Sequence, residues 1–173
     1  MFSVAILEQH GGKITRDIKA GLGHAGMSDE ITIKQAEYLA DVSGSYDLFV
    51  ICPMEEYARH PAESNISAKI LLLPDVFPKK MIHTIAAGLV VSFGLSVKDS
   101  ITLSSLAPKQ AVLTLQREIL CLNGVNLEQQ EIPLYIPKGA DANRIMAVNA
   151  ALLLLGLPPE RLSLPHAPEK TIV

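Results

Sequence analysis

A strand-like block at about residues 88–137 places the strongest constraint on how this chain can fold. Two apolar-rich runs meet inside it at Asn123-Gly124, a dipeptide typical of type I′ hairpin turns because both central residues must tolerate a positive φ. A third run, residues 101–106, precedes the hairpin and is followed by a turn at Pro108. The sequence therefore predicts an antiparallel three-stranded meander.

Three apolar runs ahead of this block predict inner strands of a parallel sheet. They cover residues 2–7, 46–52 and 69–73. A strand that is buried on both faces is apolar at nearly every position, because helices cover both sides of a parallel sheet. The predicted fold class is therefore α/β, with a mostly parallel inner sheet flanked by helices, followed by the antiparallel three-stranded meander and a C-terminal helix. A length of 173 residues suits one domain over residues 1–173, with an irregular tail at 165–173.

Four segments are expected to be helical. The first covers residues 15–22, with Thr15 as its N-cap. The second covers residues 28–42, which carry apolar side chains near helical spacing after Ser28. Residues 78–87 begin at Pro78, which suits the first position of a helix. Asp141 is expected to cap a helix that runs to Leu155 and ends at Gly156.

Composition and charge indicate which partners to expect. A net charge of -3 with scattered Lys and Arg residues predicts no nucleic-acid partner. The apolar stretches at 84–97 and 150–157 fall short of the roughly 18 residues of a membrane span. Because the first residues do not resemble a signal peptide, we expect a cytoplasmic location. A hydrophobic content of 49% suits strands buried on both faces, or a homo-oligomer or protein partner.

The edge of the predicted meander offers one surface for such a partner. Ile132, Leu134 and Ile136 alternate around Pro133, which lacks a backbone N–H group. A proline at this position is typical of an edge strand. We therefore expect this edge to be a candidate dimer contact.

Two glycine-rich patterns resemble parts of nucleotide sites. Residues 21–26 have the form GxGxxG, but the charged segment 13–20 precedes them instead of a buried strand, so they indicate the loop at the end of a helix. Gly11-Gly12-Lys13 lacks the spacing and the following Ser or Thr of a phosphate-binding loop. We expect no cofactor. Cys52 and Cys121 lie among apolar neighbours and are expected to be buried thiols.

The candidate ligand-binding residues follow the inner strand at 46–52, where ligands bind in open α/β sheets. They are Glu55, Glu56, Arg59 and His60. On a helix, Glu56 would share a face with His60, which permits a metal or acid–base pair. The alternative is a solvated first turn with i,i+4 ion pairs, favoured because no third ligand stands at metal-site spacing. No metal ion and no catalytic group is assigned.

A family resemblance covers about residues 47–162. Its segments are VVSFGLSVKDSITLSSL, QQEIPLYIP and an alanine-rich helix closing with LLLLGLPPERL. Together with the preceding inner strands, this order of elements resembles the later half of the Mur ligase central domain. There, a strand ending in YG or FG, two hairpin strands and a helix ending in LGIP follow one another. The resemblance implies an α/β fold and a nucleotide site.

The chain differs from the family at the positions that bind nucleotide and metal. Nothing between Phe2 and Glu30 matches the ATP-binding loop, and residues 52–57 replace the metal-binding sequence. A family His-Asn pair that contacts nucleotide falls on Ala140 and Asp141. The family's first and third domains also have no counterpart in this sequence, and no catalytic constellation is recognisable.

Three hypotheses follow from these departures. The first is a non-catalytic Mur-ligase-like protein that acts in ligand binding or protein assembly, because a fold does not carry its chemistry once the site residues are gone. The second is a small enzyme or a metal- or ligand-binding domain that uses residues 53–60. The third is an accessory subunit of a ligase-type enzyme.

Overall fold

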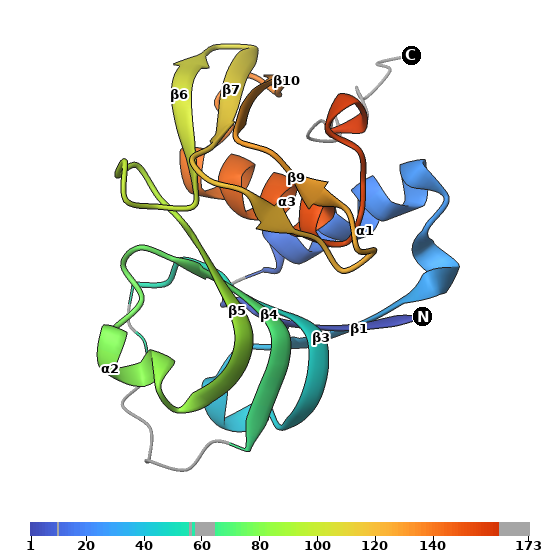
Figure 1. The fold of residues 1–173 in the computed structure, drawn as a ribbon, viewed down its shortest axis with the longest axis vertical. Helices are drawn as coiled ribbons and strands as arrows, with labels where there is room; N and C mark the ends of the chain where they lie inside the picture. The colour runs from blue at the N-terminus through green and yellow to red at the C-terminus, as the bar shows by residue number, and fades with distance from the viewer. Residues whose placement is uncertain (10, 56, 58–64, 163–173) are drawn as a thin grey trace.

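The computed structural model describes residues 1–9, 11–55, 57 and 65–162. Its main sheet has eight strands in the order β10-β7-β6-β5-β4-β3-β1-β2 (Figure 1). The strands are β1 (Phe2–Leu7), β2 (Ile31–Ala36), β3 (Gly44–Ile51), β4 (Ile66–Pro74), β5 (Ile85–Phe93), β6 (Ile101–Ala107), β7 (Gln110–Leu115) and β10 (Gln130–Tyr135). Strands β1 to β5 are parallel, and β6, β7 and β10 form an antiparallel block. The predicted α/β class is confirmed.

The remaining elements are short, apart from two helices. The helices are α1 (Lys13–Ala25), α2 (Lys79–Ile82) and α3 (Ala142–Leu154), with 3-10 turns at Ser28–Glu30, Leu39–Asp41 and Pro159–Arg161. The strands β8 (Ile119–Leu120) and β9 (Asn126–Leu127) form a separate hairpin between β7 and β10 in the chain. None of the helices in the described ranges is long and apolar enough to cross a membrane.

Both faces of the parallel sheet are buried, which explains the uninterrupted apolar runs. On one face, Leu48 and Val50 of β3 join a core cluster with residues of α1 and α3. On the other face, Phe49 and Ile51 pack in a second cluster with Leu39 of a 3-10 turn. The strands therefore lie between two layers, as the sequence predicts for an inner sheet.

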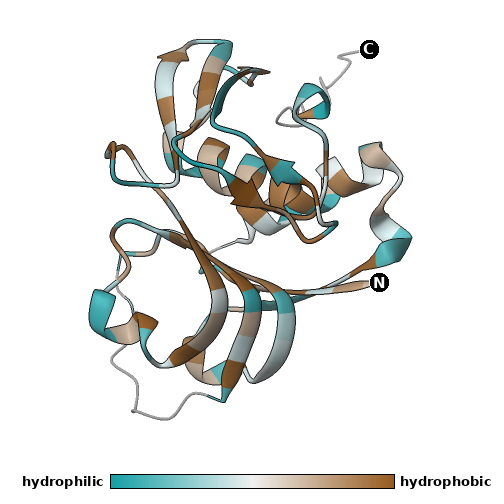
Figure 2. Ribbon diagram, viewed as in Figure 1, coloured by the Kyte–Doolittle hydropathy of each residue, from teal (hydrophilic) through white to brown (hydrophobic). Residues whose placement is uncertain are grey.

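Helix α3 forms as its sequence predicts. The Asp141 carboxylate accepts a hydrogen bond from Arg144 N at 2.9 Å, and Gly156 follows the helix with a φ of 102°. Every residue from Ile145 to Leu154 is buried, and a helix that is apolar on all sides belongs in a core. Figure 2 shows this apolar helix between the antiparallel block and the parallel strands.

Two predicted helices are wrong. Residues 28–42 form β2 with a 3-10 turn on each side, because Ile31 to Ala36 pair in parallel with β1. The segment Ile-Thr-Ile at its start has β-branched side chains, which favour a strand once a partner edge is present. The predicted helix at 78–87 is reduced to α2, because β5 already begins at Ile85 against β4.

The meander is confirmed, but its hairpin turn lies elsewhere. Strand β7 pairs antiparallel with both β6 and β10, while Asn123-Gly124 belongs to the inserted β8–β9 hairpin. Gly124 N donates to Cys121 O at 3.0 Å, and Cys121 N donates to Val125 O at 2.9 Å. Leu122 and Asn123 are therefore the central residues, followed by Gly124 at a φ of 83°. This is the three-residue pattern with a glycine bulge rather than a type I′ turn.

Candidate functional site

The order of strands in the sheet reverses between β1 and β3, so the carboxyl ends of these two strands form a topological switch point. Strand β1 has β2 on one side and β3 on the other, so the loops that follow β1 and β3 lead away to opposite sides. Ligands of open α/β sheets bind in the crevice between such loops. Glu55, the predicted candidate residue that the structure describes, follows β3 at this same edge.

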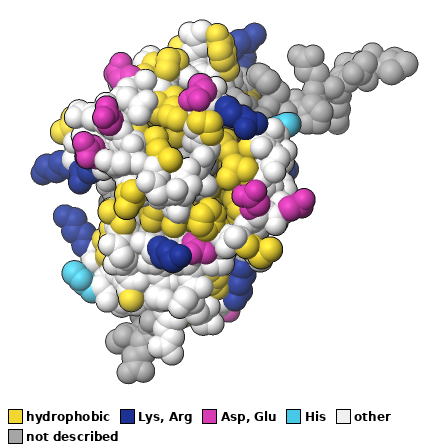
Figure 3. All heavy atoms as spheres, turned by 45° about the vertical axis from the view of Figure 1, so that its right-hand side comes forward, with side chains coloured by type: hydrophobic (Ala, Val, Ile, Leu, Met, Phe, Trp, Pro, Cys, Tyr) yellow, Lys and Arg dark blue, Asp and Glu magenta, His cyan; other side chains and the backbone are white. Residues whose placement is uncertain are grey.

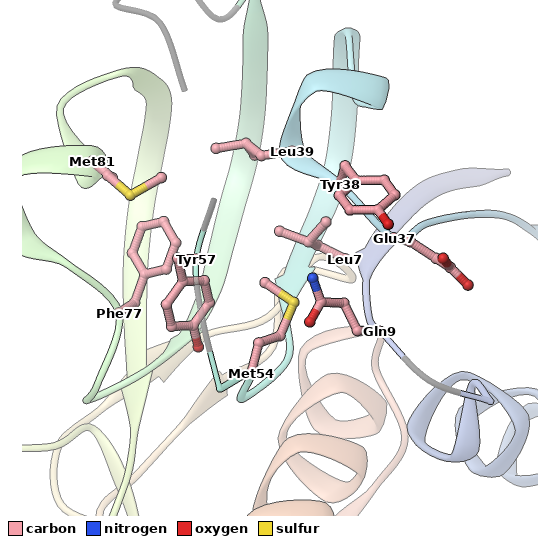
Figure 4. A pocket seen from close by; sticks show the side chains of 9 residues that line it. All are labelled: Leu7, Gln9, Glu37, Tyr38, Leu39, Met54, Tyr57, Phe77 and Met81. Carbon is pink, nitrogen blue, oxygen red and sulfur yellow. The ribbon is translucent and has the colours of Figure 1, made fainter. Parts of the chain in front are cut away.

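A small crevice lies at this edge, with a volume of about 10 Å³, which is room for roughly one water molecule. It is lined by Leu7, Gln9, Glu37, Tyr38, Leu39, Met54, Tyr57, Phe77 and Met81. In Figure 4, the Gln9 amide and the Met54 thioether occupy the middle of the crevice, whereas the Glu37 carboxylate points away from it. The lining is therefore mainly aromatic and thioether, with one central amide.

Tyr57 forms a fixed wall of the crevice. Its ring meets the Phe77 ring edge to face, with centroids 4.9 Å apart. Its hydroxyl donates a hydrogen bond to Cys52 O at 3.1 Å. Burial, with smaller contributions from Cys52 and Asp75, raises the pKa of Tyr57 to about 12. The phenol therefore stays protonated near neutral pH and acts as a positioned donor rather than an acid.

The structure tests only part of the predicted site. Glu55 is exposed and does not line the crevice. Glu56, Arg59 and His60 lie outside the described residues, so their role stays a prediction. The residues that line the crevice were not predicted from the sequence, although some of them follow β1 and β3, and ligands are expected at the carboxyl ends of such strands. Glu37 and Tyr38 were missed because their segment was predicted to be a helix.

Glu8, the residue that follows β1, closes the N-terminus of α1. Its carboxylate accepts hydrogen bonds from Ile14 N at 2.7 Å, from Thr15 N at 2.9 Å and from Thr15 Oγ1 at 2.7 Å. Glu8 is only 6% exposed. In doubly wound folds, the helix N-terminus after the first strand is the place that holds a phosphate group. Here a carboxylate of the chain itself takes the position of that anion.

The glycines around α1 serve the helix and not a ligand. Gly12 precedes the helix at a φ of 58°, and Gly26 ends it at a φ of 73° with its N–H group on Gly23 O. Gly21 and Gly23 lie within the helix itself. The GxGxxG pattern is therefore the end of α1, as the sequence analysis concluded.

Behind Glu8, an ion pair joins the two long helices. The Arg144 guanidinium of α3 donates through Nε to the Asp17 carboxylate of α1, which is buried. The hydrogen bond to Asp17 raises the pKa of Arg144 despite its partial burial, with further contributions from Asp141 and Glu8. The charges of Asp17 and Arg144 thus neutralise each other, and Glu8 is held by hydrogen bonds within the fold.

The two cysteines are buried and free, as predicted. Burial, and then the charge of Glu8, raises the pKa of the Cys52 thiol well above its usual value. Burial alone raises the pKa of Cys121 to about 11. Both thiols are therefore protonated near neutral pH, and a protonated thiol is a poor nucleophile.

Two carboxylates approach each other beyond the carboxyl ends of β4 and β5. Gly94 separates them, since a Cβ atom at that position would stand 2.6 Å from an oxygen of Asp75 and 2.6 Å from an oxygen of Asp99. Asp99 also accepts a hydrogen bond from Ser96 N at 3.2 Å. Within the described ranges, no three His, Cys, Asp or Glu side chains are grouped so that they could hold a metal ion.

The comparisons with known proteins add no relative. No protein-family model matches the chain, and no curated protein matches its sequence.

Proposed function

We propose that this chain is a non-catalytic protein of Mur-ligase-like architecture that acts in protein assembly without using a nucleotide. The observation that carries the proposal is the Glu8 carboxylate at the N-terminus of α1. The order of parallel strands, antiparallel block and closing helix agrees with the order of elements on which the resemblance rests. The ion pair between Asp17 and Arg144 and the protonated Cys52 thiol near Glu8 suit a scaffold better than an enzyme.

The energetic case rests on competition between two anions for one set of donors. A phosphate group would have to displace a buried carboxylate that accepts three hydrogen bonds, each worth roughly 1.5–3 kcal/mol because the acceptor is charged. If the carboxylate stayed in place, the two anions would repel each other in a poorly hydrated site. Binding of a nucleotide at this helix is therefore strongly disfavoured.

Titration calorimetry with ATP and Mg²⁺ tests the proposal. We expect the wild-type protein to give no heat of binding. The variant Glu8→Gln, which removes the charge and keeps the size of the side chain, serves as the comparison. Binding by this variant alone would locate the obstruction at Glu8. Saturable binding of ATP by the wild type would overturn the proposal.

A second candidate function, binding of a small molecule, is favoured by the crevice at the edge of the sheet. The crevice has room for about one water molecule, so a ligand would enter only when the flexible Met54 side chain turns away. The aromatic and thioether lining would then suit an apolar group, and the Gln9 amide can both donate and accept a hydrogen bond. The ligand class would be a small aromatic or apolar molecule with one polar substituent.

A thermal-shift screen with small aromatic fragments tests this second candidate. We expect Met54→Phe, which places a bulkier side chain in the middle of the crevice, to abolish the shift caused by any fragment that binds there. Glu55→Ala is the matched control, because Glu55 follows the same strand but lies outside the lining. A shift that is lost in Glu55→Ala or His60→Ala and kept in Met54→Phe would favour the residues predicted from the sequence instead.

A further inference from the structure

Strand β5 has a free edge, although it lies in the middle of the strand order. It pairs with β4 along its whole length, from Ile85 to Phe93, but it pairs with β6 only at Phe93 and Ile101. Figure 1 shows β5 and β6 diverging from this point. Mutual hydrogen bonds between Ser92 and Ser100, at 3.3 and 3.1 Å, hold the point of divergence. Among the described residues, no strand pairs with this edge of residues 85–92.

The free edge is apolar on both faces. Leu89 is 37% exposed and Val90 is 43% exposed, and neighbouring residues of a strand point to opposite sides. Val76, Leu95 and Val97, in the loops after β4 and β5, are also exposed. These exposed apolar side chains form a surface of the kind that typically meets a partner. Figure 3 shows hydrophobic side chains gathered across the middle of one face of the molecule.

The two outer edges of the sheet are protected, whereas β5 is not. Strand β10 carries exposed Glu131 and Pro133, and strand β2 carries exposed Lys34. Charged residues and proline on an edge strand prevent pairing with another chain. In contrast, residues 84–97 contain no charged residue and no proline. The backbone groups that point outward from β5 are therefore available to an added strand.

We propose that β5 pairs with β5 of a second copy of this chain, antiparallel and about a two-fold axis. An isologous contact of this kind closes on itself, so it produces a dimer and not a fibre. This inference deepens the proposed function, on which it rests, by naming the assembly. It also moves the expected dimer contact from the edge at Pro133 to an edge inside the strand order.

Charge favours the antiparallel orientation. Lys79 and Lys80 are exposed in α2, shortly before β5 begins, whereas the exposed charges near its carboxyl end, Asp75 and Lys98, have opposite signs and Asp99 is buried. A parallel pair would bring the lysines of the two copies together, whereas an antiparallel pair places them at opposite ends of the interface, and like charges set side by side are costly. Between these ends the uncharged strand brings no like charges together. The nearby Lys69 is already neutralised by Asp47, at 2.7 Å.

Light scattering coupled to size-exclusion chromatography tests the pairing. We expect the wild type to have twice the 18.7 kDa mass of one chain, and Val90→Lys to have the mass of one chain. Val90→Thr, which adds no charge and keeps a strand-favouring side chain, should remain dimeric. Tyr135→Lys is the matched control, because Tyr135 is 71% exposed on the outer strand β10. Circular dichroism would show that each variant is folded.

Two results would overturn the inference. One is a wild type that stays monomeric at every concentration measured. The other is a dimer that Tyr135→Lys dissociates and Val90→Lys does not, which would place the contact at β10. If the wild type is monomeric and does not bind ATP, the β5 pairing is contradicted and the proposed function is not. Binding of ATP would overturn the proposed function whatever the mass.

Single cysteines along β5 test the orientation. In an antiparallel pair about a two-fold axis, only a residue close to the axis meets its own counterpart within the reach of a disulfide. We therefore expect oxidation of the variants Ala86→Cys, Ala87→Cys, Leu89→Cys and Val90→Cys to yield a covalent dimer at one position, with the yield falling on either side. The native cysteines are buried, so we expect them to form no disulfide between copies. Equal yields at all four positions would contradict the antiparallel arrangement.

Discussion

Replacing Glu8 by alanine should lower the free energy of unfolding by about 3 kcal/mol, because two buried backbone donors and one hydroxyl lose their acceptor together. The loss also removes a negative charge from the positive end of the α1 dipole. Gly12, the residue at the N-cap of the helix, has no side chain that could take over this role. Urea denaturation of the purified protein, followed by circular dichroism, measures the change.

Two comparison variants separate the carboxylate from a general effect of substitution. Glu8→Gln keeps the size of the side chain, but its amide can turn only one oxygen toward the donors, so we expect an intermediate loss. Glu55→Ala removes an exposed carboxylate and should change the free energy of unfolding by less than about 0.5 kcal/mol. If Glu8→Ala were as mild as Glu55→Ala, the carboxylate would not be what holds the start of α1.

Much of the fold is predictable because local sequence and tertiary position agree. Strand β3 is apolar from Leu48 to Ile51 and is buried from both sides, and α3 has a capping Asp141 and a terminating Gly156. In such segments the pattern, the caps and the environment all favour the same structure.

The errors arise where pairing with a distant strand decides the structure. Residues 31–36 show no clear period, and they become a strand only because the open edge of β1 lies beside them. The start of β5 at Ile85 depends in the same way on β4. The turn type at Gly124 depends on which residues of the short hairpin face each other, which a dipeptide alone does not specify.

The position of the candidate site was more predictable than its residues. The general rule for strand ends indicates the edge of the sheet from the sequence alone. The crevice itself combines side chains that follow different strands, including Gln9 and Phe77, and their proximity exists only in the folded chain. The role of Glu8 was likewise invisible, because a glutamate after a strand has no pattern that distinguishes a helix cap from a solvated side chain.

Removing Arg144 should also destabilise the fold, since it leaves the buried Asp17 carboxylate without its partner. We expect Arg144→Ala to lower the free energy of unfolding by about 3 kcal/mol, the lower end of the range for a broken buried pair, because 31% of the Arg144 side chain is exposed. Water can reach the position and reduce the cost. The pair links α1 to α3, so its loss also weakens the contact between the two helices.

A double-mutant cycle in urea denaturation measures the pair itself. Asp17→Asn removes the charge that Arg144 neutralises, so Arg144→Ala in that background should cost about 1 kcal/mol, which leaves a coupling of roughly 2 kcal/mol. An equal cost of Arg144→Ala in both backgrounds would mean that the stabilisation comes from packing of the arginine stem and not from its charge. Because Arg144 also lies within the electrostatic influence of Glu8, the cycle should be repeated with Glu8→Gln. A larger coupling in that third background would show that the two carboxylates compete for one cation.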